Sequence, residues 1–147
     1  MEADFIWQNC NNTKESSRPY IEQMAFTLTK DDDKNLITAT YEANTSYQDR
    51  IDLLHMLARI LGSQPKMNVL INTAEARTNM SDAEQLEYGK LLAENAHYFQ
   101  YNRTAIVKNS KNPHPYILAE AYSNGFKNFV EFENAIEAIA WLNGEIR

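Results

Sequence analysis

Two polar segments of the chain carry side chains that could hold an anion. One follows residue 73 and reads "AEARTNMS"; the other follows residue 108 and reads "NSKNPHP". Each leads into a predicted helix, and the free amides at a helix N-terminus favour negative charge. Two ordinary solvated loops are the competing interpretation. The candidate binding residues are Arg77, Thr78, Asn79, Ser81, Lys108, Ser110, Lys111 and His114.

The chain has three histidines, a residue type that can serve as a metal ligand or as a general base. His55, His97 and His114 fall on three different predicted elements, without the spacing of a metal site. We therefore predict surface histidines and no metal. An enzyme that uses His114 with Lys108 or Arg77 on an anionic substrate is the weaker alternative, because no paired general acid and base stand at a recognisable spacing.

Glycine usage argues against the common enzyme classes. The four glycines, at positions 62, 89, 125 and 144, form no phosphate-cradling loop, and no G-x-S-x-G elbow occurs. Hydrolases, kinases and dehydrogenases thus lose their usual sequence support. We predict a protein without catalytic residues and without a cofactor.

An acidic segment, "DDDKNLITATYE", partly fits a calcium-binding loop. Asp31, Asp33, Asn35 and Glu42 stand at its first, third, fifth and twelfth positions. The sixth position, which requires glycine for the sharp turn, is Leu36, and strand-like residues follow it. We interpret the segment as the solvated turn of a hairpin.

Hydrophobic periodicity predicts the elements that must position these residues. Two strands, "MAFTLTK" and "NLITATYEA", flank the turn "DDDKN". The predicted helices are residues 47–61, residues 81–100, "PYILAEAY" and "NAIEAIAWL"; the remaining predicted strands are residues 67–73, "RTAIVKN" and "FKNFVEF". This order predicts an α/β fold with a mixed sheet of about five strands, a hairpin followed by parallel strands, covered by about four helices. Because ligands bind outside the carboxyl ends of parallel strands, the loops after residues 73 and 108 are the expected site.

Length and composition favour one domain and a particular compartment. The chain has 147 residues, of which 44% are hydrophobic, and it suits a single core. We predict a tail over residues 1–22, which lack a sustained period, and a domain over residues 23–147. The lone Cys10 and an acidic N-terminus without a long apolar run favour a cytoplasmic protein with no transmembrane segment. A net charge of -6 disfavours nucleic acid as a partner.

The first predicted helix has an unusually wide apolar face. Its polar residues fill a narrow stripe, so one sheet cannot cover the rest. Leu53, Met56 and Ile60 therefore need another cover. A neighbouring helix, a dimer seam with a second copy, and an apolar ligand groove are the three alternatives.

With these elements in view, the chain resembles the STAS superfamily, in particular its SpoIIAA-like branch grouped with lipid-binding Sec14-type domains. The resemblance rests on the element order, the junction "MNVLINT…MSDAE" and the ending "FVEFENAIEAIAWL", and it covers roughly residues 24–143. It implies a non-enzymatic module that binds a protein partner or a small apolar or lipid-like ligand in a regulatory role.

The resemblance also gives Ser81 a second interpretation. Ser81 and Glu84 form a capping box at the predicted helix start, which by itself accounts for the serine. In anti-sigma factor antagonists of this family, a serine at about this place is phosphorylated. Those proteins have an aspartate before the serine and small residues after it, where this chain has Met80, Asp82 and Ala83. We therefore rank three interpretations of Ser81: a helix cap first, the edge of a binding site second, and a phosphorylation-switched interaction third.

Overall fold

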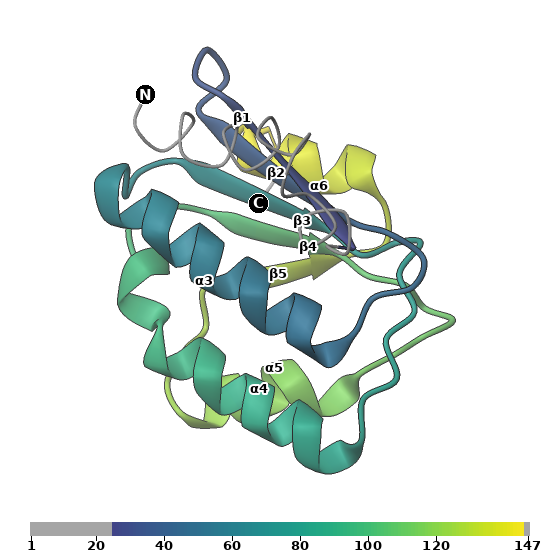
Figure 1. Cartoon of the computed structure of the whole chain (residues 1–147). Coiled ribbons are helices and arrows are strands. Elements are labelled where there is room, and N and C mark those ends of the chain that lie inside the picture. The colour runs from purple at the N-terminus through teal and green to yellow at the C-terminus, as the bar shows by residue number, and fades with distance from the viewer. Residues whose placement is uncertain (1–24, 146–147) are drawn as a thin grey trace, which may run out of the picture.

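The computed structural model describes residues 25–145, which fold into a five-stranded mixed sheet and four α-helices (Figure 1). The predicted tail over residues 1–22 lies outside the described residues. The strands are β1 (Phe26–Asp31), β2 (Leu36–Tyr41), β3 (Asn68–Asn72), β4 (Thr104–Val107) and β5 (Phe129–Phe132). The helices are α3 (Tyr47–Ser63), α4 (Asp82–Glu94), α5 (Pro115–Ser123) and α6 (Ala135–Leu142), with a short 3-10 helix η1 (Ala96–Phe99). The predicted α/β class and the mixed sheet are confirmed.

The strands lie in the sheet in their order along the chain. β1 and β2 form the predicted antiparallel hairpin, and β2 to β5 run parallel to one another. The acidic segment is the hairpin turn, in which the Asp31 carboxylate accepts a hydrogen bond from the Lys34 amide at 3.2 Å. Asn35 closes the turn with a φ of 54°, a left-handed conformation that asparagine tolerates.

Helices cover both faces of the sheet (Figure 1). α3, α4 and α5 lie on one face because each right-handed connection adds the next parallel strand on the same side. α6 lies on the other face, against β3, β4 and β5. Alternate residues of β3 serve the two layers: Val69 and Ile71 belong to the large core under α3, and Leu70 to the smaller core under α6.

The second predicted helix ends earlier than its periodicity indicates. We expected one helix over residues 81–100, but α4 ends at Glu94 and η1 follows. Asn95 lies at the junction, and its side-chain amide donates to the Leu91 carbonyl at 2.9 Å. Asparagine competes in this way for helical carbonyls, which makes it a poor interior helix residue.

The wide apolar face of α3 is largely covered within the chain. α4 and η1 contact this helix beside the sheet. Leu53 and Ile60 are only 1% and 3% exposed, while Met56 is half-buried against the same core. Of the three residues, only Met56 presents substantial surface to a second copy of the chain. Within residues 25–145, none of the helices combines the length and apolar character that a membrane crossing needs.

Candidate ligand-binding cavity

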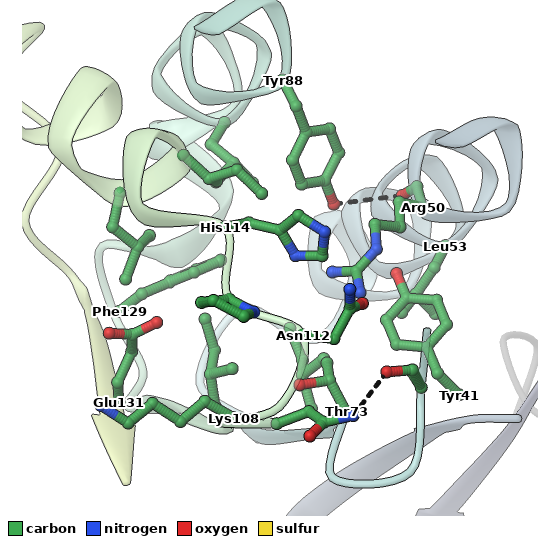
Figure 2. A pocket seen from close by; sticks show the side chains of 18 of the residues that line it. Tyr41, Arg50, Leu53, Thr73, Tyr88, Lys108, Asn112, His114, Phe129 and Glu131 are labelled. Atoms are coloured by element: carbon green, nitrogen blue, oxygen red, sulfur yellow. Dashed lines mark hydrogen bonds between the residues drawn. The ribbon is translucent and has the colours of Figure 1, made fainter. Parts of the chain in front are cut away.

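A cavity of about 160 Å³ lies between the sheet and the helices α3, α4 and α5 (Figure 2). It opens at the carboxyl ends of the parallel strands, where Tyr41 ends β2 and Thr73 and Lys108 follow β3 and β4. The two predicted loops meet here, since Asn72 and Val107 are partners in the register of β3 and β4. The expectation that both loops lie at one edge of the sheet is therefore confirmed.

The inner wall of the cavity is apolar. Its side chains come from the sheet and from all three helices on this face, so no single element forms the pocket. The apolar lining residues are Leu53, Leu54, Leu57, Ile71, Ala76, Leu92, Ile106, Ile117, Leu118 and Phe129. A cavity on the order of 150 Å³ with such a lining can hold one benzene-sized molecule.

The opposite wall is polar and centres on Arg50. In Figure 2 the Arg50 guanidinium lies between the His114 imidazole and the Tyr41 ring. Its Cζ is 4.9 Å from the centroid of the Tyr41 ring, a cation–π contact. The Arg50 side chain belongs to α3 and the residue is only 8% exposed.

Thr78 joins the polar wall to both loops. Its Oγ1 accepts a hydrogen bond from Nε of Arg50 at 2.9 Å, and its amide donates to Oδ1 of Asn112 at 2.8 Å. Its carbonyl accepts a hydrogen bond from Nε2 of His114 at 2.9 Å. The loop after β3, the loop after β4 and the helix α3 are thus connected at one buried threonine.

His114 departs from the prediction that all three histidines lie on the surface. His55 and His97 are exposed, but His114 is half-buried at the cavity. Burial lowers the pKa of His114, and the nearby Arg50 charge lowers it further against the opposing effect of the Thr78 carbonyl. The imidazole is therefore a neutral hydrogen-bond donor near pH 7.

Two buried tyrosines add hydroxyl groups to the polar wall. The Tyr88 hydroxyl donates to the Arg50 carbonyl at 3.1 Å, which ties α4 to α3. Burial raises the pKa of Tyr88 to about 12 and raises that of Tyr41 well above its ordinary value. Both phenols consequently stay protonated and can donate hydrogen bonds throughout the physiological range.

The remaining charged groups of the cavity lie away from Arg50. Lys108 lines the cavity, but its Nζ is 3.2 Å from a carboxylate oxygen of Glu133. In Figure 2 the Lys108 side chain extends toward β5 and Glu131 stands on the far side of the pocket from Arg50. Glu131 is exposed.

The other predicted site residues are spread over the surface of the two loops. Arg77, Asn79, Ser110 and Lys111 are exposed and do not line the cavity. Ser81 is also exposed and is the N-cap of α4. The predicted capping box is confirmed: Oγ of Ser81 accepts from the Glu84 amide at 3.1 Å, and Glu84 accepts from the Ser81 amide at 3.0 Å. Of the eight candidates, only Lys108 and His114 reach the cavity itself.

Arg50 is the residue that the sequence prediction missed. Its signal was present, because Arg50, Leu54, Leu57 and Leu61 fall at the i, i+4, i+7 and i+11 positions of the buried face of α3. A charged residue at the start of a buried stripe indicates a functional or paired charge. Residues 25–145 contain no cluster of three His, Cys, Asp or Glu side chains that could hold a metal ion.

Comparisons with known proteins identify no relative of this chain. No protein-family model, no curated protein and no solved structure matches the chain.

Proposed function

We propose that the chain binds one small ligand with an apolar body in the cavity under α3, α4 and α5, as a non-enzymatic regulatory module of the STAS/SpoIIAA-like kind. The observation that carries the proposal is the cavity itself, about 160 Å³ at the carboxyl edge of a parallel sheet. This edge is the usual ligand position in open α/β sheets. A body of one ring or a short branched chain fits the volume.

The two-sided lining supports a binding role. An apolar wall that includes Leu54, Ile71 and Ile117 would exclude water from the ligand body, and the polar wall around Arg50 would orient it. The order of hairpin, helices and parallel strands is one of the features on which the STAS resemblance rests. A cytoplasmic location accompanies that proposal.

The alternative functions have less support. Ser81 is occupied as a helix cap, and Asp82 and Glu84 beside it would repel an added phosphate. An enzymatic role for His114 would require a proton-transfer partner. Within residues 25–145 the imidazole bonds to the Thr78 carbonyl and not to a carboxylate.

The test combines ligand capture with a cavity-filling variant. The purified chain is denatured and its retained small molecules are identified by mass spectrometry; in parallel, toluene is titrated into the isotope-labelled protein and followed by NMR. We expect the shifted amides to surround the cavity.

The matched variants are Leu118→Trp, which fills the cavity from α5, and Leu86→Trp, on the exposed face of α4. We expect Leu118→Trp to weaken toluene binding at least ~10-fold and Leu86→Trp to leave it unchanged, with thermal unfolding as the check that both fold. The proposal would be contradicted if the protein retains no small molecule and if toluene shifts the same amides equally in the wild type and in Leu118→Trp.

A further inference from the structure

Arg50 is a buried cation that forms no ion pair with a carboxylate of residues 25–145. The residue is only 8% exposed, and within residues 25–145 no ion pair involves it. Burying a charge without a partner is costly, so such groups are normally paired or hold a ligand. The unmatched charge lies in the polar wall of the cavity.

The contacts of Arg50 fix its orientation and leave its outer edge free. Nε donates to Thr78 at 2.9 Å, and Cζ lies over the Tyr41 ring, 4.9 Å from its centroid. The two terminal nitrogens have no hydrogen-bond partner among the described residues. Neither nitrogen is fully buried. Arg50 lines the cavity, and in Figure 2 its guanidinium lies at the pocket wall between His114 and Tyr41.

Among the described residues that line the cavity, no other group pairs with this charge. Lys108 is itself a cation and is paired with Glu133. His114 donates its Nε2 proton to a carbonyl, and Glu131 stands across the pocket. A bound ligand is thus the remaining source of a negative charge at this wall.

The donors available at this wall suit a carboxylate better than a phosphate. A phosphate has three oxygens to satisfy and is typically held by several amides or cations. The start of α5 offers little: Pro113 and Pro115 have no N–H, and the Tyr116 amide already donates to Gln85 at 3.1 Å. One guanidinium fork with two free nitrogens matches the two oxygens of one carboxylate.

We propose that the ligand is a small monocarboxylate, whose carboxylate pairs with the terminal nitrogens of Arg50 while its ring-sized or branched apolar body fills the inner cavity. This inference rests on the proposed function. It adds the chemical class of the ligand and names Arg50 as the residue that recognises its carboxylate.

The first test compares charged and neutral probes on the unmodified protein. Benzoate and hexanoate are titrated against benzamide and hexanamide near pH 7, with binding followed by NMR, including the Nε–H resonance of Arg50. We expect each carboxylate to bind at least ~10-fold more tightly than its amide, because a charge-assisted bidentate contact is replaced by a neutral one. Equal or weaker binding of both carboxylates overturns the inference.

The second test changes Arg50. Arg50→Met keeps the length of the side chain without its charge, and Arg59→Met is the matched control on the exposed side of α3. We expect Arg50→Met to weaken benzoate binding on the order of 10- to 100-fold with toluene binding retained, and Arg59→Met to change neither. Benzoate affinity unchanged in a folded Arg50→Met variant overturns the inference.

Toluene binding distinguishes a failure of the carboxylate inference from a failure of the proposed function. If toluene binds in the cavity and the carboxylates show no advantage, the proposed function stands and the carboxylate inference fails. If toluene, the amides and the carboxylates all leave the cavity resonances unshifted, the proposed function fails as well. Should Arg50→Met not fold, the probe pairs on the unmodified protein still decide.

Discussion

Nε of Arg50 donates a hydrogen bond to Oγ1 of Thr78 across 2.9 Å, although 28 residues separate them in the chain. This bond links the first turn of α3 to the loop that follows β3. The same threonine holds Asn112 and His114 through its backbone groups. The orientation of the buried guanidinium therefore depends on two loops whose sequences carry no catalytic motif.

Replacing Thr78 with valine tests this dependence. Valine keeps the shape of threonine but removes the oxygen that accepts from Arg50, which leaves a buried charged donor with one partner fewer. We expect the free energy of unfolding to fall by about 1–3 kcal/mol in urea denaturation. Thr27→Val, at an exposed position of β1, should change it by less than about 0.5 kcal/mol. A Thr78→Val variant as stable as that control would show that the bond contributes nothing.

Replacing Ser81 with alanine tests the capping box of α4. The substitution removes the Oγ that accepts from the Glu84 amide and leaves an unsatisfied donor at the helix start. We expect a loss of about 0.5–2 kcal/mol in unfolding free energy, measured by urea denaturation. Ser81→Thr keeps the acceptor and should lose less, and Ser110→Ala, in an exposed loop, should be neutral. An unaffected Ser81→Ala would show that the cap contributes nothing to the stability of the protein.

The sequence predicted the order of the elements because their periodicities are strong and their boundaries carry clear signals. Pro115 begins α5, and Gly125 follows its end with a φ of 93°, a conformation that favours glycine. Ser81 and Glu84 marked the start of α4. The early end of α4 was missed because a single polar contact of Asn95 outweighs a continuing apolar pattern.

The cavity could not be predicted in the same way. The cavity is the space that remains unfilled after side chains from β2 to β5 and from three helices have packed together. No local sequence pattern indicates that these side chains leave such a space. The loops were located because parallel strands end at one edge of a sheet. Arg50 is separated from those loops in sequence by the rest of α3 and by β3. Only its alignment with Leu54 and Leu57 on the buried face of α3 indicated its role.

Gly89 marks the closest approach of α4 and α5. A Cβ at this position would lie 2.5 Å from the Ile117 carbonyl oxygen and 2.7 Å from Cβ of Glu120. Alanine is the better helix former by about 1 kcal/mol, but here it must push the α5 backbone away. We expect Gly89→Ala to lower the unfolding free energy by about 1–3 kcal/mol.

Gly62 provides the matched control for that substitution. It also lies in a helix, α3, but its nearest neighbour to an added Cβ is Cε1 of Tyr98 at 3.7 Å, an ordinary contact. Gly62→Ala should therefore stabilise the protein by up to about 1 kcal/mol, since only the helix propensity changes. Thermal and urea unfolding of the two variants give the comparison. Equal effects at both positions would contradict the close packing of α4 on α5.

His114 makes the stability of the protein depend on pH. Burial, with the Arg50 charge in addition, holds its folded-state pKa below the ordinary value of 6.5. The unfolded chain then binds a proton that the folded chain does not, over the interval between the folded pKa and 6.5. The free energy of unfolding must fall as the pH drops through that interval, and above it His114 contributes no pH dependence.

The comparison of the wild type with His114→Gln isolates this contribution. Glutamine can still donate from its amide to the Thr78 carbonyl, but it does not titrate, and the other titrating groups are common to both proteins. We expect urea denaturation to show the stability of the wild type, relative to the variant, constant above about pH 7, decreasing as the pH falls below 6.5, and constant again below the folded pKa. If the stability of the wild type relative to His114→Gln instead increases on acidification, the folded state takes up the proton first. His114 would then lie in an environment that favours its charged form.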